Sequence, residues 1–315
     1  MPLPETIRVS FGTAIALGLR QARQEVAPTT AYLLWDPGCR GSCSFCPRAG
    51  GNAGSDRLSR IAWPEVPWAE VVGRLAARPG PLRRICLQTG WNDGAAATLP
   101  LFIAALRPTG LPLSLTLHPA QVPLVDDLLA AGLDHVGLGL DAAGPATYEH
   151  HKGRAWDTDW PALRRALDRH GPRLEIHLIF GLGDTERAFL EVVEAVLARG
   201  GLVALFAFTP TGGHGSPPPL DSWRRVQAFR HLRLLGALRW EDCRFAADGR
   251  LASFGLPPDR LAAALADGRA FQTSGCPDCN RPFYNERPGG VMYNFPRPLS
   301  PDEARQAMAD LGLAE

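Results

Sequence analysis

Three cysteines, Cys39, Cys43 and Cys46, stand within eight residues in the pattern Cys-x3-Cys-x2-Cys. Thiolates this close together are typical metal ligands, and complete cysteine ligation of a four-iron cluster takes four of them. Three thiolates therefore hold three irons and leave the fourth iron open for chemistry. The alternative is a structural zinc site, but zinc prefers a closed set of four ligands, and no cysteine or histidine follows Cys46 for about forty residues. The pattern favours an iron–sulfur cluster.

The composition limits the classes of protein that the chain can represent. Its 315 residues exceed a typical domain of ~100–200 residues but accommodate one α/β barrel with terminal extensions. The chain has no run of ~18 apolar residues, which is the length that predicts a membrane span. The net charge of +1, with no basic block, argues against a nucleic-acid surface. Seven cysteines without a secretion signal indicate reduced, metal-binding thiols. We expect a protein of the cytoplasm that binds neither nucleic acid nor membrane.

From Thr30 onward, short apolar runs alternate with segments long enough for helices. The expected strands are Ala31–Trp35, Arg84–Gln88, Leu113–Leu117, His135–Leu140, Glu175–Phe180 and Leu202–Phe208. The expected helices between them are Val66–Ala77, Leu99–Arg107, Val122–Ala131, Trp160–His170 and Arg187–Arg199. This alternation is typical of an α/β chain with parallel strands, whose carboxyl ends gather at one edge. We expect the active site there, beside His118, although a structurally satisfied histidine is the simpler interpretation of that residue.

The two ends of the chain differ from this regular middle part. Near-helical spacing of Phe11, Ala14, Leu17 and Leu19 predicts a helix within residues 7–27. After Pro210, the expected elements are a loop over 211–219, a helix over 222–235, a hairpin over 240–254 that carries Cys243, and helices over 261–265 and 301–311. The predicted organisation is an N-terminal helical extension (1–29), a barrel (30–215) and a cysteine-bearing C-terminal extension (216–315).

With Phe45 directly before the third cysteine, the run from Trp35 to Pro47 resembles the radical S-adenosylmethionine (SAM) superfamily. The resemblance implies a (β/α)6 partial TIM barrel. It also implies a [4Fe-4S] cluster whose open iron chelates the amino and carboxylate groups of SAM. An electron from that cluster would cleave SAM to methionine and a 5'-deoxyadenosyl radical.

The same resemblance implies a set of SAM-binding residues. Phe45 adjoins the cluster. Gly90 follows the second strand, where the family binds the SAM amino group. The familiar Gly-Gly-Glu is absent there, and an ordinary turn is the alternative interpretation of Gly90. Asp141 matches a biotin synthase segment that contacts the SAM ribose; an N-cap role on the next helix competes with this interpretation, and both roles are compatible. Gly181 and Gly183 resemble the Gly-Leu-Gly-Glu-Thr segment of biotin and lipoyl synthases, which lies against adenine.

A second group of cysteines lies far downstream, where Cys276 and Cys279 are separated by two residues. Together with Cys243 they make three ligands for an auxiliary [4Fe-4S] cluster, and structural zinc on the Cys276 and Cys279 pair is the alternative. The fourth ligand of the cluster is left open among Cys86, Ser274, Arg281 and other residues. Cys86 lies inside a predicted strand, so a small core residue is the simpler interpretation of it.

Segments spread along the chain resemble one branch of the superfamily, the two-subunit lipoyl synthases first found in archaea. These segments are Arg8–Ala14, Thr29–Leu33, Ser44–Ala49, Tyr284–Gly290 and Tyr293–Pro298. The chain lacks the Cys-x4-Cys-x5-Cys motif and the Arg-Ser-Ser-Tyr of single-chain lipoyl synthase. The resemblance implies sulfur insertion into an octanoyl chain on a carrier protein or lipoyl domain, with the auxiliary cluster consumed as sulfur donor.

The implied partners are a homologous second radical SAM subunit and an electron donor such as ferredoxin or flavodoxin. Other functions remain open. A biotin synthase-like enzyme, or another radical SAM enzyme that acts on a small molecule, fits the same motifs. A non-catalytic iron–sulfur subunit for electron transfer or scaffolding, and a zinc-stabilised binding module, are further alternatives. Cleavage of SAM to 5'-deoxyadenosine by the reduced protein would exclude the last two.

Overall fold

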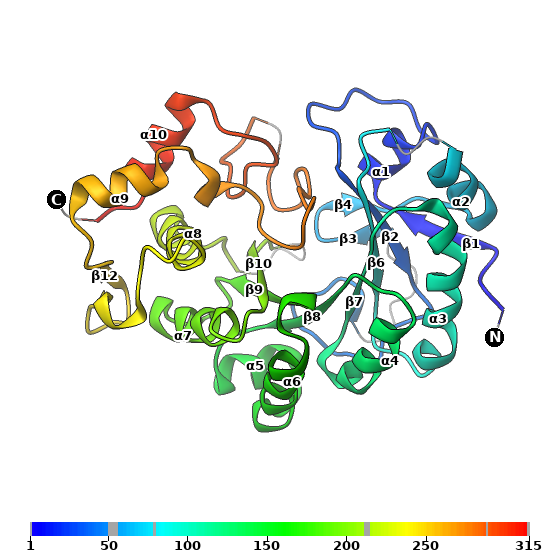
Figure 1. Ribbon diagram of the computed structural model, residues 1–315, viewed down its shortest axis with the longest axis horizontal. Coiled ribbons are helices and arrows are strands. Elements are labelled where there is room, and N and C mark those ends of the chain that lie inside the picture. Colours follow the sequence, from blue (N-terminus) through cyan, green and yellow to red (C-terminus); the bar gives the residue numbers. More distant parts are fainter. Residues whose placement is uncertain (1, 50–55, 78–79, 211–214, 288, 314–315) are drawn as a thin grey trace.

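The computed structural model describes residues 2–49, 56–77, 80–210, 215–287 and 289–313. Its centre is an eight-stranded sheet in the order β10-β9-β8-β7-β6-β2-β1-β5 (Figure 1). Six neighbouring strands are parallel, namely β2 (Thr30–Trp35), β6 (Arg84–Thr89), β7 (Leu113–Leu117), β8 (His135–Asp141), β9 (Leu174–Phe180) and β10 (Leu202–Ala207). All six expected strands are confirmed, each end to within one residue. The expected α/β partial barrel is therefore correct.

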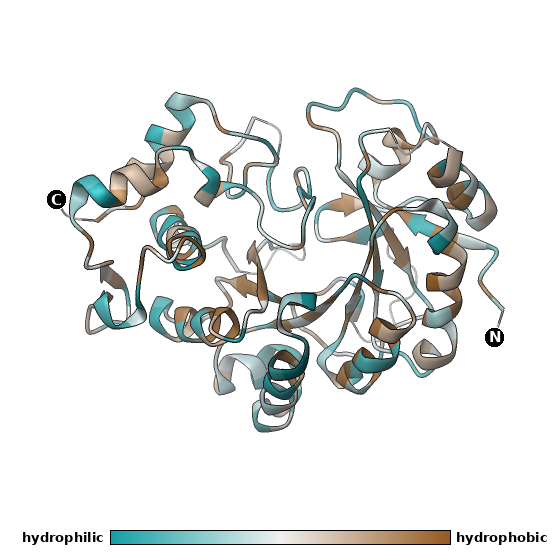
Figure 2. Cartoon of the chain, in the orientation of Figure 1, coloured by the Kyte–Doolittle hydropathy of each residue, from teal (hydrophilic) through white to brown (hydrophobic). Residues whose placement is uncertain are grey.

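Helices connect these strands and cover the outside of the sheet (Figure 1). They are α2 (Trp68–Ala77), α3 (Ala95–Leu106), α4 (Val125–Ala130), α5 (Pro145–Lys152), α6 (Trp156–His170) and α7 (Glu186–Leu197). The helix expected over Val122–Ala131 is shorter, because a 3-10 turn (Pro119–Leu124) containing Pro123 precedes α4. Helix α5 was not expected. Figure 2 shows apolar residues concentrated in the strands and polar residues on the outer helices, as burial of the sheet requires.

The N-terminal helix expected within residues 7–27 is largely wrong. Residues Thr6–Val9 form strand β1, which pairs antiparallel with β2 and with β5 (Glu65–Pro67). Only Phe11–Ala16 are helical (α1), and the side chain of Ser10 accepts a hydrogen bond from the N–H of Thr13 at its start. The alternating burial of Ile7 and Val9 has the period of a strand. The N-terminal segment therefore extends the central sheet.

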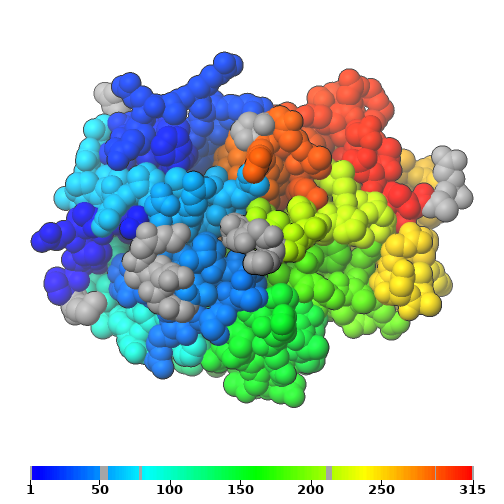
Figure 3. All heavy atoms as spheres, turned by 180° about the vertical axis from the view of Figure 1, so that it is seen from behind, coloured from blue at the N-terminus to red at the C-terminus, as the bar shows by residue number. Residues whose placement is uncertain are grey.

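The C-terminal part contains α8 (Leu220–Leu234), the hairpin β11 (Arg244–Phe245) and β12 (Leu251–Ser253), α9 (Pro258–Leu265) and α10 (Pro301–Ala309). These elements agree with the expected ones, whereas residues 211–214 of the expected loop lie outside the described residues. Between α9 and α10 the chain returns to the barrel, and Figure 3 shows this orange segment against the N-terminal half. In the described part of the chain, no helix is both long and apolar enough to span a membrane.

A buried ion pair ties this C-terminal part to the barrel. Arg225 on α8 is fully buried, and its Nη2 lies 2.6 Å from Oε1 of Glu186 at the start of α7. Arg225 also donates to the carbonyl of Leu311, while Oε2 of Glu186 accepts from the N–H of Leu251 on β12. Four segments therefore meet at one charge pair. Removal of Arg225 leaves the charge of Glu186 buried without an ion-pair partner, whereas Arg225 also pairs with Asp221.

We expect Arg225→Met to lower the free energy of unfolding by about 3–5 kcal/mol, since it leaves Glu186 uncompensated inside the protein. Arg297→Ala is the control, because Arg297 pairs with Glu303 in a solvent-exposed position, where ion pairs contribute about 0–1 kcal/mol. Urea denaturation followed by circular dichroism measures both changes. Equal losses of unfolding free energy in the two variants would contradict the larger contribution expected from the buried ion pair.

Candidate active site

The first cysteine group lies in the loop that follows β2. The N–H of Gly41 donates to Sγ of Cys39 over 3.3 Å. A methyl group on Gly41 would lie 3.4 Å from Sγ of Cys39 and 3.7 Å from Sγ of Cys43, so both sulfurs face the same glycine. Burial, opposed in part by the backbone N–H of Arg48 and reinforced by Cys43 and Cys39, raises the pKa of Cys46 to about 11. The three thiols are therefore gathered at the carboxyl ends of the strands.

Gly90, which follows β6, lies directly against this loop. A methyl group at Gly90 would stand 2.9 Å from Cβ and 3.1 Å from Sγ of Cys39, closer than side chains approach each other. The carbonyl of Trp91 accepts a hydrogen bond from the N–H of Arg40. The carbonyl of Gly90 itself accepts from the side chains of Thr89 and Asn92. The close approach explains the glycine; its contact with SAM remains a prediction.

Asp141 at the end of β8 is held by the only lysine of the chain. Its φ of +69° is unusual for a residue with a side chain, and Nζ of Lys152 lies 2.6 Å from its Oδ2. Lys152 is 3% exposed and also donates to the carbonyl of Gly139. Burial opposes the charge of Lys152, but Asp141 and Cys43 offset this and raise its pKa. A cation thus lies between the predicted ribose ligand and a predicted cluster ligand.

The alternative N-cap role for Asp141 is wrong. The N-cap of the next helix, α5, is Gly144, and no side chain caps it. The side chain of Asp184 instead accepts from the N–H of Ala143, which connects the loops after β8 and β9. The positive φ of Asp141 lies where the pairing of β8 with β9 shifts register, and its contact with the ribose of SAM remains a prediction.

The other predicted SAM contacts lie near this mouth. Phe45 lines the interior cavity, and Nζ of Lys152 lies 5.8 Å from its ring centroid. Gly181 and Gly183 have φ of +108° and +117°. A methyl group at Gly181 would press on Phe208 at 3.1 Å, whereas one at Gly183 would meet nothing within 4 Å. Gly181 is therefore explained by packing, and Gly183 remains the more open of the two positions.

His118 has a structural role at the same mouth. Its Nδ1 accepts from the N–H of Ala120 in a capping box, and its ring stacks on Trp91 with centroids 5.1 Å apart. Burial first, then the charges of Lys152 and Arg154, lowers the pKa of His118 to about 3. The ring is therefore neutral and carries its proton on Nε2. The interpretation of His118 as a structurally satisfied histidine therefore explains the hydrogen bond that its Nδ1 accepts.

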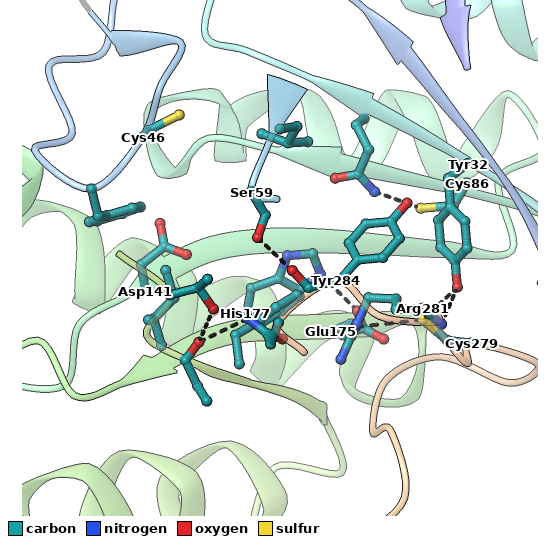
Figure 4. A pocket seen from close by; sticks show the side chains of 18 of the residues that line it. Tyr32, Cys46, Ser59, Cys86, Asp141, Glu175, His177, Cys279, Arg281 and Tyr284 are labelled. Atoms are coloured by element: carbon teal, nitrogen blue, oxygen red, sulfur yellow. Dashed lines mark hydrogen bonds and ion pairs between the residues drawn. The ribbon is translucent and has the colours of Figure 1, made fainter. Parts of the chain in front are cut away.

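A cavity of about 200 Å³ runs from this mouth into the barrel (Figure 4). Cys46 and Asp141 line one end. Cys86, Cys279 and Arg281 line the other. The walls between the two ends are mostly apolar, and include Leu58, Ile179, Phe206 and Phe208. The interior of this barrel is consequently open to a ligand that reaches from one group of cysteines to the other.

The second cysteine group enters the barrel from its opposite, amino-terminal end. The side chain of Arg84, at the start of β6, donates to the carbonyl of Pro277, and that of Thr30 donates to the carbonyl of Asp278. Sγ of Cys276 lies 3.5 Å from Oγ of Ser114, at the base of β7. Sγ of Cys279 lies 3.6 Å from the hydroxyl of Tyr32. The loop therefore closes the bottom of the barrel with its thiols facing inward.

The structure brings Cys86, and not Cys243, to this second group. Burial raises the pKa of Cys86 to about 12, and the nearby charges of Cys279 and Glu175 contribute. Cys86 is buried in a small hydrophobic cluster with Tyr32, as expected for a core residue, and its side chain also lines the cavity. Cys243 follows the 3-10 turn Trp240–Asp242, in the main hydrophobic core, and does not line the cavity. The charges nearest to its thiol belong to Asp242, Arg233 and Glu194.

The thiols of the two cysteine groups do not converge on single points. In the described part of the chain, no three His, Cys, Asp or Glu side chains converge closely enough to hold one metal ion. A four-iron cluster binds each thiolate to a different iron, which requires sulfurs that surround a space rather than a point. The first group, with three thiols and an open fourth position, fits that donor set. At the second group, an auxiliary cluster and a zinc ion both remain predictions.

Sequence interpretation missed Lys152, Glu175 and His177, which all face the interior. Glu175 and His177 are two residues apart on β9, and Oε1 of Glu175 lies 2.7 Å from Nε2 of His177. Burial opposes the charge of Glu175, but His177 and Arg281 lower its pKa to about 2, so the carboxylate is ionised. The period-two spacing of Glu175, His177 and Ile179 on β9 was the available signal for the two β9 residues, since alternate residues of a strand face one side.

We expect Gly90→Ala to lose about four irons per chain, one cluster's complement, because the methyl group displaces Cys39. Gly73→Ala on α2 is the control, since a methyl group there meets nothing within 4 Å and alanine favours a helix by about 0.5–1 kcal/mol over glycine. Iron and sulfide analysis of anaerobically reconstituted protein compares the two. Full iron content in Gly90→Ala would show that the loop of Cys39 still binds its cluster when the methyl group displaces that cysteine.

We expect Lys152→Met to lower the midpoint potential of the cluster held by Cys39, Cys43 and Cys46. A nearby positive charge favours the reduced, more negative form, and a tenfold change in this one-electron equilibrium corresponds to about 59 mV. Redox titration followed by electron paramagnetic resonance (EPR) measures the shift. Lys152→Arg keeps the charge and should stay within about 59 mV of the wild type; a potential unchanged in both variants would contradict the electrostatic role.

The model of the radical SAM superfamily matches residues 35–196, slightly more than half of the chain. The [FeFe]-hydrogenase maturase HydG from Carboxydothermus hydrogenoformans is 17% identical with a TM-score of 0.50, and the match covers 66% of this chain and 52% of that chain. A radical SAM methyltransferase from Sphaerobacter thermophilus is 17% identical with a TM-score of 0.47, covering 72% and 71%. No curated protein matches.

The chain thus spans about half of the length of the HydG protein, and at this identity the likeness shows the fold alone. The family match covers the strand that precedes the cysteine loop, the loop itself and the elements through most of α7. Together with three cysteines gathered at the carboxyl ends of a parallel partial barrel, this match shows that the chain belongs to the radical SAM superfamily.

Proposed function

We propose that this protein inserts sulfur into an unactivated C–H bond and that it is one subunit of a two-protein lipoyl synthase. One observation carries the sulfur-insertion part of the proposal: a single cavity joins the radical SAM cysteines to a second cysteine group at the other end of the barrel. The substrate carbon would then lie between the source of the radical and a source of sulfide. The assignment to lipoyl synthase rests on the resemblance of the sequence segments described above.

The dimensions of the barrel support this arrangement. Cys86 lies on β6 and Gly90 directly after it, four residues further along. A strand rises about 3.3 Å per residue, so the backbone at Cys86 lies about 13 Å from the backbone at Gly90, which contacts the first cysteine loop. The two cysteine groups are too far apart to share one cluster, and near enough for a ligand held between them to contact both.

The cavity walls support an alkyl substrate. Ile179, Phe206 and Phe208 present apolar side chains between the two ends, and Leu58 closes the cavity on the other side. An apolar wall stabilises a buried hydrocarbon chain by about 0.8 kcal/mol per CH₂ group. The octanoyl group of a carrier protein or lipoyl domain fits this chemistry, with its attachment point outside the barrel. The walls also exclude water and competing hydrogen donors from a reactive radical.

When bound, SAM and the cluster of Cys39, Cys43 and Cys46 supply a 5'-deoxyadenosyl radical that takes a hydrogen atom from the substrate. The residues of this chain position the reactants. Asp141 presents a carboxylate oxygen toward a ribose, and Lys152 neutralises it. Phe45 and Gly183 are the remaining predicted contacts with the nucleoside. Holding the reacting atoms in contact replaces a bimolecular encounter by an intramolecular step, which is the main contribution a protein makes here.

The auxiliary ligand set that we propose is Cys86, Cys276 and Cys279, in place of the set containing Cys243. Cys86 comes from a barrel strand, as the auxiliary cysteines of biotin synthase do, and this favours biotin synthase-like sulfur insertion into a small molecule as a second candidate. The two candidates share the chemistry and differ in substrate. If this protein is a lipoyl synthase subunit, its partners are a homologous radical SAM subunit, a carrier protein and an electron donor such as ferredoxin or flavodoxin.

We expect the Cys39/Cys43/Cys46 triple alanine variant to retain about four irons per chain at the auxiliary site. Adding Cys86→Ala to it should remove most of this iron, whereas adding Cys243→Ala should not. Both cysteines are buried to a similar extent, so the pair is a matched comparison. Iron and sulfide analysis with EPR of the reduced protein provides the measurement. Retention of iron without Cys86, or its loss without Cys243, would contradict the ligand set.

Substrate identity is tested with an octanoylated lipoyl domain, SAM and a chemical reductant, with and without the second subunit. The expected product gains the mass of one sulfur atom, and each turnover yields 5'-deoxyadenosine. If 5'-deoxyadenosine forms but sulfur enters only a small-molecule substrate, the biotin synthase-like candidate replaces the first. If the triple variant retains no auxiliary iron, sulfur insertion from a cluster is wrong.

A further inference from the structure

Glu175 stands at the bottom of the cavity with one oxygen unused. The residue is 2% exposed and lines the cavity near the second cysteine group (Figure 4). Its Oε1 lies 2.7 Å from Nε2 of His177. Among the residues that the structure describes, no N–H or O–H group donates to Oε2, and the remaining side-chain hydrogen-bond partner of the carboxylate is the thiol of Cys276. A polar oxygen buried without an N–H or O–H partner is costly, so its position at the cavity indicates a site for a ligand.

The unused oxygen faces the loop of the second cysteine group. A methyl group on Gly275 would lie 3.2 Å from Oε2 of Glu175 and 3.3 Å from Cβ of Cys279. Nη1 of Arg281 would lie 3.3 Å from the same methyl group, so all three groups face one position beside Gly275. Cys276 follows Gly275 directly, and the charge of Glu175 is the largest influence on its thiol after burial. Glu175 thus belongs to the same small space as the cysteines.

The basic side chains nearby are bound to other groups. Arg281 donates to the carbonyls of Ser274 and Leu205, and its Nη1 lies 3.6 Å from Sγ of Cys279. Arg84 donates to the carbonyl of Pro277 and pairs with Asp134. Arg230 is also close enough to interact with the charge of Glu175, and it donates to the carbonyl of Val203. Among the described residues, none of the three arginines forms an ion pair with Glu175. They balance charge around the space without filling the coordination of Oε2.

Ser274, another candidate for the fourth ligand, is already engaged. Its Oγ accepts a hydrogen bond from the N–H of Leu205 over 2.8 Å. This contact directs the hydroxyl toward the backbone of β10. Glu175 is the one acidic residue among those lining this end of the cavity.

We propose that Oε2 of Glu175 is the fourth protein ligand of the auxiliary iron–sulfur cluster, beside Cys86, Cys276 and Cys279. His177 then orients the carboxylate through Oε1, as second-sphere partners orient ligating groups in other metal sites. The inference rests on the proposed auxiliary cluster and deepens it. An oxygen ligand binds soft, sulfur-bound iron less tightly than a thiolate does. The iron at this corner is therefore the most readily released of the four.

The experiment uses the full chain carrying the Cys39/Cys43/Cys46 triple alanine change, so that only the auxiliary cluster gives a signal. Into this parent we introduce Glu175→Gln, Glu175→Cys and, as control, Glu286→Gln. Glu286 is a similarly buried glutamate that accepts hydrogen bonds from Asn294 away from the cavity. Reconstitution with ⁵⁷Fe and sulfide permits Mössbauer and EPR spectra of each protein.

The expected parent spectrum contains one iron site in four with an oxygen ligand. Glu175→Gln should lose about one iron in four, Glu175→Cys should keep all four with an all-thiolate spectrum, and Glu286→Gln should match the parent. Parent spectra in both Glu175 variants overturn the inference while leaving sulfur insertion intact. If Glu175→Gln does not fold, Glu175→Cys decides by its spectrum alone. A parent without auxiliary iron instead overturns the proposed function.

Discussion

Closure of the amino-terminal end of the barrel by the loop around Cys276 and Cys279 is the constraint on which the rest of the site depends. The hydroxyl of Tyr32 accepts from the N–H of Arg281 and contacts Cys279, which joins strand β2 to residues far downstream. Asp278 and Arg281 have positive φ angles, which cost energy in residues with a side chain. Such a loop keeps its shape only because the strands bind it at several points.

The closed end gives the barrel two chemically different ends. Most parallel barrels fill their interior with side chains and use only the carboxyl ends of the strands. Here Gly137 on β8 makes room for the ring of His177, whose Nε2 would lie 2.7 Å from a methyl group at that position, and His177 lines a cavity inside the barrel. The cavity therefore continues past the SAM end of the barrel. A substrate that enters at the mouth reaches groups supplied by the C-terminal extension.

Electrostatics separates the two ends further. Lys152 and Asp141 form a neutral pair beside the first cysteines, while two arginines surround the second cysteines and Glu175. Buried charges of this kind are tolerated because each one has partners, and removal of a single partner leaves a costly uncompensated charge. The charge pattern is a property of the closed barrel, since Lys152, Arg84 and Arg281 come from segments far apart in the chain.

Much of the fold followed from local sequence patterns. Continuous apolar runs predicted every parallel strand, because strands buried on both faces consist of such runs. The same reasoning failed at the N-terminus, where Ile7 and Val9 alternate over too few residues to outweigh the helical spacing that follows. It also failed for Asp141, whose cap role required knowledge of where α5 begins. Short elements are decided by what they pack against, and a sequence does not display its neighbours.

The sequence by itself determined the superfamily, because three cysteines within one short loop can converge without help from the rest of the chain. It also identified Cys276 and Cys279 as a pair for the same reason of proximity. Only the tertiary structure decided their partner. Cys243 is nearer in sequence, yet it is buried in another part of the core, whereas Cys86 and Glu175 face the pair across the barrel. Ligands from distant strands meet only when the sheet curves around a common interior.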